Sequence, residues 1–407
     1  MRTGPHTRTV AARQFFNRGG LLSRWHPAYE FRQGQLEMAE AVESALAERR
    51  HLIVEAGTGT GKTLAYLIPA ILSGKRVVVS TGTKNLQEQL YFKDVPFLQR
   101  HMGKPLRVCY MKGRNNFACR QKIYDAEREP VLEGLEEVAD FQVIRGWEQK
   151  TELGDRAEIT TLAAGSTAWG KIDARRERCP GQKCAQFYRC FITAMQLRAM
   201  ESDIIIVNHH LFFADLAVKD EEHDGIIPEY SAVVFDEAHE IEDIAGQFFG
   251  VGASSYQVEE LRRDIASLSH RKGFGTAELD RTLITLDDCA AAFFNLFAEA
   301  EGRRGQRDIL PVLRRGAAVY HNLQSCFELL SNQLRVIKGQ PEELIPVINR
   351  LEELSANLEF WRQGNQSGFV YWFERRGRGV FLQSTPIDVS SLLAKKLFES
   401  TDTVVLA

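Results

Sequence analysis

Short apolar runs alternate with longer amphipathic stretches over much of the chain, a pattern typical of a parallel α/β sheet. The runs are rich in β-branched residues, as buried strands are, and they fall at residues 52–54, 76–81, 203–207, 232–235 and 403–406. Stripes with helical spacing cover residues 35–50, 63–72 and 86–100. We therefore expect an α/β fold with a parallel sheet flanked by helices.

Two long stretches interrupt this alternation. Residues 105–200 are largely polar and carry clustered cysteines, whereas residues 245–365 carry helical apolar stripes. The second stretch predicts an inserted domain of three or four antiparallel helices. Strand patterning returns at residues 369–384, and a helix at 390–398 then precedes the last apolar run. We expect residues 369–407 to rejoin the first sheet.

Composition narrows the class of protein. The chain has 407 residues, of which 44% are hydrophobic and 26% charged, with a net charge of −3. These values describe a globular protein of two to three domains without a global basic field, although a local basic groove remains compatible with them. No apolar run is long enough to cross a membrane, and residues 1–16 lack the apolar core of a secretory signal. Seven cysteines, an odd number, argue against a disulfide scaffold.

The first apolar run leads into a glycine-rich turn and then a helix, which is the context of a phosphate-binding P-loop. The candidate phosphate-binding residues are Ala56, Gly57, Thr58, Gly59, Thr60, Gly61, Lys62 and Thr63. Backbone N–H groups and the helix N-terminus would hold the phosphates, Lys62 would reach the β- and γ-phosphates, and Thr63 would bind Mg²⁺. Ala56 stands where the usual motif has glycine, which the remaining glycines make tolerable.

A second apolar strand, residues 232–235, delivers two carboxylates to its carboxyl end. In a P-loop enzyme Asp236 belongs with Mg²⁺, and Glu237 is placed to orient or deprotonate the attacking water. His239 could couple this site to another part of the protein. Upstream of the P-loop, Gln35 could present a donor and an acceptor to adenine, with a preceding aromatic residue stacked on the ring; an ordinary helix flank is the alternative.

Two further regions of the sequence suggest contact with nucleic acid. The loop 80–85 offers small donors at the carboxyl end of a strand, where a DNA backbone could bind, although a simple helix cap explains it equally well. Basic residues interleave with Phe187 and Tyr188, which resembles a nucleic-acid footprint, with a solvated charged face as the alternative. These basic residues are Lys171, Arg175, Arg176, Arg178, Lys183 and Arg189.

Three cysteines, Cys179, Cys184 and Cys190, lie within twelve residues, and Cys119 is available as a distant fourth ligand. Four thiolates suit structural zinc or an iron–sulfur cluster, and the absence of paired Cys-x2-Cys favours the cluster. Unliganded cysteines remain a third interpretation. The pair His209 and His210 ends the predicted strand 203–210. Neighbours on a strand face opposite sides, so we expect these histidines to organise the site or to form hydrogen bonds rather than to chelate a metal.

The motifs together resemble those of the iron–sulfur superfamily 2 DNA helicases, the DinG/XPD-like family. The resemblance spans most of the chain from residue 29 onward. It is carried by Arg32-Gln33-Gly34-Gln35, the P-loop, residues 112–119, the three clustered cysteines, residues 207–212 and Asp236-Glu237-Ala238-His239.

The resemblance implies a RecA-like motor lobe with an inserted iron–sulfur domain and an inserted helical Arch domain. It implies a 4Fe–4S cluster on Cys119, Cys179, Cys184 and Cys190, and an adenine contact made by Gln35 with support from Arg32. It also implies ATP- and Mg²⁺-dependent 5′-to-3′ translocation on single-stranded DNA, with Lys62, Asp236 and Glu237 as catalytic residues. A monomer acting in DNA repair in the cytoplasm, on single strands and on forked or 5′-tailed duplexes, is the corresponding expectation.

The implied domains are a lead-in at 1–28, the motor lobe at 29–104 and 201–245, the iron–sulfur domain at 105–200, the Arch at 246–368, and a return to the lobe at 369–407. Members of this family continue into a second motor lobe, so we expect this chain to be a fragment that binds ATP weakly and hydrolyses it slowly. The alternative is a nucleic-acid-binding or regulatory module that keeps the lobe without motor activity.

Overall fold

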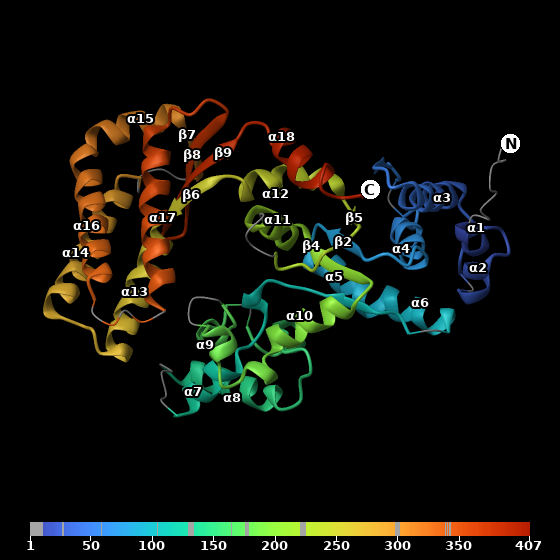
Figure 1. Ribbon diagram of the computed structural model, residues 1–407, viewed down its shortest axis with the longest axis horizontal. Coiled ribbons are helices and arrows are strands. Elements are labelled where there is room, and N and C mark those ends of the chain that lie inside the picture. The colour runs from blue at the N-terminus through green and yellow to red at the C-terminus, as the bar shows by residue number, and fades with distance from the viewer. Residues whose placement is uncertain are drawn as a thin grey trace. The chain divides into compact units, whose positions relative to one another are not determined.

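The computed structural model describes residues 11–26, 28–57, 59–103, 105–128, 134–163, 165–175, 179–219, 225–297, 302–337, 339, 341 and 343–407. The chain divides into two compact units (Figure 1). The first unit comprises Met1–Ile244 and Ser390–Ala407, and the second comprises Ala245–Val389. Each unit has its own sheet and its own hydrophobic core.

A six-stranded parallel sheet forms the centre of the first unit, and its strand order is β1-β10-β5-β2-β4-β3. The strands are β1 (Leu52–Ile53), β2 (Val77–Thr81), β3 (Val108–Tyr110), β4 (Ile204–Asn208), β5 (Ala232–Phe235) and β10 (Thr403–Leu406). The central strands are buried along their length, as their continuous apolar runs predict. The predicted α/β fold with a parallel sheet is confirmed.

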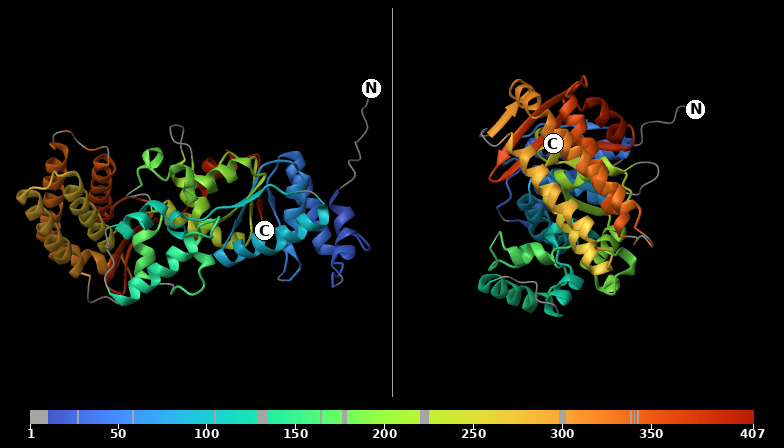
Figure 2. Two further views of the ribbon diagram at one scale, coloured as in Figure 1. Left: turned by 90° about the horizontal axis from the view of Figure 1, so that it is seen from below. Right: turned by 90° about the vertical axis from the view of Figure 1, so that its left-hand side faces the viewer.

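Helices surround this sheet and can be followed from further directions in Figure 2. They include α1 (Ala11–Phe16), α2 (Leu21–Trp25), α3 (Gln33–Glu48), α4 (Lys62–Leu72), α5 (Lys84–Gln89), α6 (Val95–Met102), α10 (Phe191–Glu201), α11 (His209–Val218) and α18 (Ser390–Leu393). The helix α12 (Ile241–Phe248) contains the point at which the chain passes from the first unit to the second. A π-helical turn, η1 (Leu90–Asp94), joins α5 to α6. The apolar stripes of α3 and α4 pack into the core beside the sheet.

The cysteine-bearing segment begins later than the sequence indicated. Residues 108–110 fall within the predicted insert, yet they form β3, the edge strand that pairs with β4. The rest of the segment folds into α7 (Arg120–Arg128), α8 (Leu135–Glu148), α9 (Thr167–Ile172) and α10, joined by short 3-10 turns. Backbone bridges of Phe117 with Asp155 and of Ala118 with Asp173 tie its start to its later loops.

The second unit combines five helices with an antiparallel sheet among its described residues. Its helices are α13 (Ser255–Lys272), α14 (Ala277–Asn295), α15 (Gln306–Arg315), α16 (Ala317–Arg335) and α17 (Leu344–Gln363). Its sheet has the order β6-β9-β8-β7, with β6 (Val251–Ser254), β7 (Gly302–Gly305), β8 (Phe369–Arg376) and β9 (Gly379–Pro386).

This sheet corrects the expectation that residues 369–384 rejoin the first sheet. β8 and β9 form a hairpin that pairs with β6 and β7, and the chain returns to the first unit only at Ser390. Alternate residues of the hairpin, such as Tyr371 and Phe373, are buried, which is the pattern of an antiparallel sheet with one covered face. No helix in the described residues is both long and apolar enough to traverse a bilayer.

Candidate nucleotide site

The glycine-rich loop joins β1 to α4, and two of its glycines have backbone angles that favour glycine. Gly59 has φ 75° and Gly61, which precedes the first residue of α4, has φ 80°. The Thr60 hydroxyl donates to the carbonyl oxygen of Gly57 at 2.9 Å, which closes the loop on itself. Thr58 lies outside the described residues. The loop therefore directs the N-terminus of α4 toward the carboxyl edge of the sheet, where α/β proteins bind ligands.

Replacing Gly61 with alanine should disrupt this loop. A Cβ atom at Gly61 would collide with the side-chain amide of Gln35, and the positive φ adds strain. We expect a loss of roughly 1–3 kcal/mol of unfolding free energy together with a loss of ATP binding. Urea unfolding and nucleotide titration measure the two effects. Gly57→Ala is the control for stability, because a Cβ there meets no atom within 4 Å, and equal destabilisation by both variants would contradict the argument.

Lys62 and Glu237 meet although 175 residues separate them in sequence. The Nζ atom of Lys62 donates to Oε1 of Glu237 at 2.9 Å. Glu237 has φ 60°, a left-handed conformation that few non-glycine residues adopt, and it is the second residue after β5. His239 Nδ1 lies 3.5 Å from the other carboxylate oxygen of Glu237. The structure thus brings together three of the residues that the sequence assigned to nucleotide chemistry.

Asp236 is buried beside this pair, and Tyr66 of α4 holds it. The Tyr66 hydroxyl donates to Oδ2 of Asp236 at 3.1 Å and also interacts with the Thr63 side chain. Oδ1 of Asp236 is buried and has no hydrogen-bond partner among the described residues. Burial raises the pKa of Asp236, whereas the contacts with Tyr66 and Lys62 oppose that rise. A buried carboxylate oxygen that lacks a donor, close to a threonine hydroxyl, fits a Mg²⁺ ligand set.

His209 joins three strand ends behind the site. Its Nε2 atom lies 3.0 Å from the backbone oxygen of Asp236, and its Nδ1 atom lies 2.7 Å from the Ser80 hydroxyl. Burial lowers the pKa of His209 to about 4, so the ring is neutral at pH 7. A carbonyl oxygen can only accept, so Nε2–H donates to Asp236 and Nδ1 accepts from Ser80. The ring holds the loop after β5 in place. The expectation that both histidines lie on a strand is wrong, because β4 ends at Asn208 and the two histidines begin α11.

Gln35 is fixed by protein groups. Its Nε2 atom donates to the Gly61 carbonyl oxygen at 3.0 Å, and its Oε1 atom accepts from the Tyr29 hydroxyl at 3.1 Å. Only 5% of Gln35 is exposed. Beside it lies a cavity of about 430 Å³ whose lining includes Tyr29, Arg32, Gln35, Thr60, Gly61 and Asp94. The structure therefore places the predicted adenine residues Arg32 and Gln35 at one cavity together with the P-loop.

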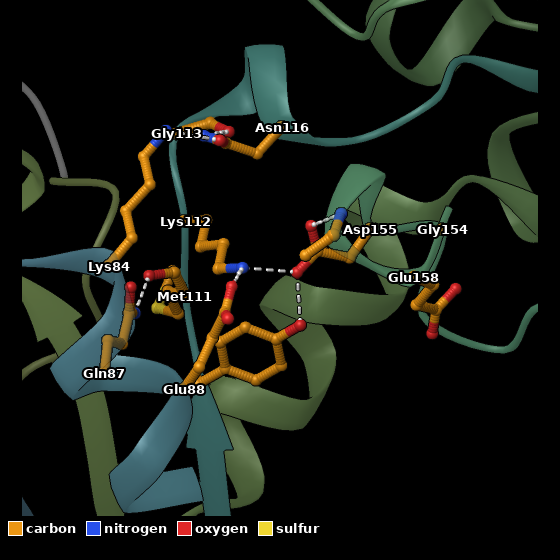
Figure 3. A network of polar contacts seen from close by, with 12 residues as sticks. Lys84, Gln87, Glu88, Met111, Lys112, Gly113, Asn116, Gly154, Asp155 and Glu158 are labelled. Atoms are coloured by element: carbon orange, nitrogen blue, oxygen red, sulfur yellow. Dashed lines mark hydrogen bonds and ion pairs between the residues drawn. The ribbon is translucent and has the colours of Figure 1, made fainter. Parts of the chain in front are cut away.

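A buried polar network connects α5 with the start of the cysteine-bearing segment (Figure 3). The Nζ atom of Lys112 lies 2.7 Å from both Asp155 Oδ2 and Glu88 Oε1, and the Tyr110 hydroxyl donates to the same Asp155 oxygen. Nearby, Lys84 Nζ donates to Asn116 at 2.8 Å. The loop 80–85, which carries Lys84, is therefore physically tied to the region that precedes Cys119.

The four candidate cysteine ligands lie in one segment, but they do not form a preorganised single-ion site. Cys119 directly precedes α7 and Cys190 directly precedes α10. Burial raises the pKa of the Cys119 thiol, and the nearby Cys190 thiol adds to that rise. Cys184 is half-buried and Cys179 is exposed. Nowhere in the described residues do three His, Cys, Asp or Glu side chains converge as a metal-ion site.

The basic and aromatic residues around the cysteines differ in their surroundings. Tyr188 is 97% exposed. Lys171 Nζ pairs with Glu137 at 2.9 Å, and Arg175 pairs with Asp173 at 2.8 Å. Arg176 and Arg178 lie outside the described residues. Two of the predicted footprint cations are therefore neutralised by acidic neighbours, which sequence spacing alone did not indicate.

Sequence and structure comparisons place these observations among known proteins. The family model described as DEAD/DEAH box helicase matches residues 35–133. The chain is 33% identical over 382 residues to the ATP-dependent DNA helicase YoaA of Haemophilus influenzae, covering 94% of this chain and 60% of that protein. It is also 33% identical over 386 residues to YoaA of Escherichia coli K12, with 93% and 60% coverage.

Two more distant similarities were also found. The 3′-5′ exonuclease DinG of Bacillus subtilis is 26% identical over 443 residues, which cover 95% of this chain and 46% of that protein. A solved chain named XPD_Helicase aligns over 93% of this chain and 58% of its own length, with 14% identity and a TM-score of 0.44. The chain spans about three fifths of the length of the two YoaA relatives.

Proposed function

We propose that this chain belongs to the DinG/XPD-like family of helicases and forms the ATP-binding lobe of an ATP-dependent DNA helicase. The observation that carries the proposal is the meeting of Lys62 with Glu237 beside the buried Asp236. These side chains follow two different strands of one parallel sheet, β1 and β5, at the edge where α/β proteins bind ligands.

Each residue has a distinct task in this proposal. The loop Ala56–Thr63 and the N-terminus of α4 bind the phosphates, and Lys62 moves from Glu237 to the β- and γ-phosphates. Thr63 and Asp236 would hold Mg²⁺, which when bound neutralises the charge on the phosphate oxygens. Glu237, released from Lys62, then orients the attacking water and accepts its proton. Tyr66 keeps Asp236 in place, and His239 lies against the other oxygen of Glu237.

The substrate of the motor would be DNA. We assign 5′-to-3′ translocation on single strands, with forked or 5′-tailed duplexes as substrates and a role in DNA repair, on the basis of the family. The loop 80–85 would contact the DNA backbone, and the exposed Tyr188 would stack on a base. We treat the protein as a cytoplasmic monomer.

Measuring ATP hydrolysis with and without single-stranded DNA tests the proposed motor function. A rate of hydrolysis that rises on addition of single-stranded DNA would support a helicase lobe. A chain that binds Mg–ATP without hydrolysing it under any DNA condition would favour a regulatory module instead.

A 4Fe–4S cluster on Cys119, Cys179, Cys184 and Cys190 is the second part of the proposal. The donor set consists of thiols alone, and Cys119 and Cys190 are already neighbours. A cluster holds its ligands farther apart than a single ion does, so its ligand thiols need not converge to the spacing of a mononuclear site. A bound cluster would supply a rigid centre that joins the loops around α7 and α10.

Changing Cys184 to serine should remove the visible absorbance of the cluster and its iron, because serine replaces one thiolate ligand. Absorption spectra and metal analysis of the purified chain measure this effect. Cys289→Ser is the matched control, since Cys289 lies in α14 of the second unit and should leave the spectrum unchanged. A colourless wild-type protein containing zinc would contradict the cluster, as would an unchanged spectrum in the Cys184 variant.

A further inference from the structure

The antiparallel sheet of the second unit has one face in the hydrophobic core and one face outside it. Tyr371 and Phe373 of β8 and Leu382 of β9 are buried in the core of this unit. Figure 1 shows the long helices α14, α16 and α17 on one side of the strands. Successive residues of a strand point to opposite faces, so the residues between the buried ones point away from the core. We call this second face the outer sheet face.

The register of the strands determines which side chains share the outer sheet face. Glu374 lies opposite both Arg303 and Phe381, and Trp372 lies opposite Gln383. Directly opposed residues of an antiparallel pair point to the same face. None of the side chains of this face is fully buried. They are Arg303 of β7, Trp372, Glu374 and Arg376 of β8, and Phe381 and Gln383 of β9.

Two aromatic rings of the outer sheet face each lie beneath an arginine. The guanidinium carbon of Arg303 is 3.8 Å from the centroid of the Trp372 ring, and that of Arg376 is 5.5 Å from the centroid of the Phe381 ring. Tyr256 adds a third ring, which is 5.9 Å from Phe381 between centroids, and this residue is 44% exposed. Unpaired bases of a nucleic acid stack on aromatic rings and on guanidinium planes.

Further arginines border the outer sheet face. Arg304 follows Arg303 on the edge strand β7, and Arg378 lies in the turn that joins β8 to β9. Both Arg304 and Arg378 are exposed. Glu374 pairs with Arg376 at 2.6 Å, whereas Arg303, Arg304 and Arg378 form no ion pair among the described residues. The surface is therefore positively charged, although the whole chain has a net charge of −3.

We propose that the outer sheet face is a binding surface for single-stranded nucleic acid, separate from the nucleotide site and from the DNA contacts of the first unit. Its arginines bind the phosphates, and its aromatic rings and guanidinium planes stack on the bases. A duplex keeps its bases stacked on each other, so the surface binds single strands in preference to duplexes. All of its residues belong to the second unit, so it shares no residue with the nucleotide site.

Photocrosslinking of the full 407-residue chain locates the bound strand directly. The probe is oligothymidylate that contains 4-thiothymidine, and crosslinked peptides are identified by mass spectrometry. We expect crosslinks within β7 and within the β8–β9 hairpin. Crosslinks confined to the first unit would overturn the proposal and leave the proposed function standing.

The salt dependence of binding tests the role of the arginines. Arg304→Ala combined with Arg378→Ala should weaken binding of oligothymidylate and lower the slope of log affinity against log salt by about 1.4, because each phosphate contact to a single strand contributes about 0.7. Fluorescence anisotropy measures both effects. Arg263→Ala combined with Arg281→Ala is the matched control, because it removes two exposed arginines from α13 and α14 of the same unit. An unchanged slope in the first variant would contradict the proposal.

A change at Phe381 tests stacking without altering charge. Phe381→Leu keeps an apolar side chain but removes the ring, so binding of oligothymidylate should weaken at least roughly fivefold while the salt slope stays the same. Circular dichroism confirms that the variant is folded, and the arginine variants provide the test if it is not. Wild-type affinity in folded Phe381→Leu would exclude stacking at this ring and overturn the proposal.

A competition experiment separates nucleic acid from an acidic peptide as the ligand. Poly-L-glutamate carries the charges of a nucleic-acid strand without its bases, so it should displace oligothymidylate poorly at equal charge. Equally effective displacement would assign the surface to acidic peptides and overturn the proposal. A chain that binds no oligothymidylate would also overturn it, and ATP binding by the same preparation would then test the nucleotide site independently.

Discussion

Lys62→Ala is expected to lower the rate of ATP hydrolysis by roughly 10²–10³-fold, because the side chain is the cation placed to meet the developing phosphate charge. The variant also leaves Glu237 without the ion pair that it makes at 2.9 Å. Steady-state hydrolysis of Mg–ATP in the presence of single-stranded DNA measures the effect. Lys395→Ala, which removes an exposed lysine of the same unit, should leave the rate unchanged.

A change at Glu237, the ion-pair partner of Lys62, should have a different effect on nucleotide binding. Glu237→Gln should still bind Mg–ATP, because Lys62 and the P-loop remain, but it should not hydrolyse it, because an amide cannot accept the proton of water. Lys62→Ala should instead weaken binding as well as turnover. Turnover at the wild-type rate in either variant would show that the catalytic roles are misassigned, even if the fold is correct.

Lys112→Met is expected to cost about 3–5 kcal/mol of unfolding free energy, the cost typical of breaking a buried ion pair from one side. The Lys112 side chain is 2% exposed and that of Asp155 is 1% exposed, so the remaining carboxylate would be left in a nearly dry environment. Urea unfolding monitored by circular dichroism measures the loss. Lys150→Met provides the control, since Lys150 is exposed and lies in the same region of the chain.

A double variant separates the two ways in which losing Lys112 lowers the unfolding free energy: the unpaired charge and the lost packing. Lys112→Met combined with Asp155→Leu should be less destabilised than the sum of the two single changes, because it leaves no unpaired charge between them. Glu88 retains 32% side-chain exposure and can be solvated when Lys112 is lost. Strict additivity of the two changes would mean that the network in Figure 3 is not coupled. A loss as small as that of Lys150→Met would show that the pair is not buried in solution.

The central strands of the first sheet were predictable because they are buried on both faces. Continuous apolar runs at residues 76–81, 203–207 and 232–235 need no partner to be recognised. The run at residues 108–110 is short and lies at the edge of the sheet, so its pairing with β4 is a tertiary effect. The sequence indicates strands at residues 369–384, but pairing partners are set by contacts distant in sequence, and these strands belong to the other sheet.

The candidate site was predictable where chemistry is tied to local spacing. Lys62 and Asp236 each follow an apolar strand, and the motif indicates what such residues do. Tyr66 was missed because an aromatic residue in an apolar helix has no distinguishing pattern before its hydroxyl is seen to reach Asp236.

The place of β10 between β1 and β5 has a consequence for the order in which the protein is made. Val54 donates to the Leu406 carbonyl oxygen at 2.9 Å, and Ala238 donates to that of Ala407 at 3.0 Å, so the last residues bridge both halves of the nucleotide site. β1 pairs with a strand that is synthesised about 350 residues later, after the whole second unit has been synthesised. Pairing over such separations is slow. The nascent chain therefore emerges with its P-loop strand unpaired, and nucleotide can help to fold this lobe only once translation has passed residue 406.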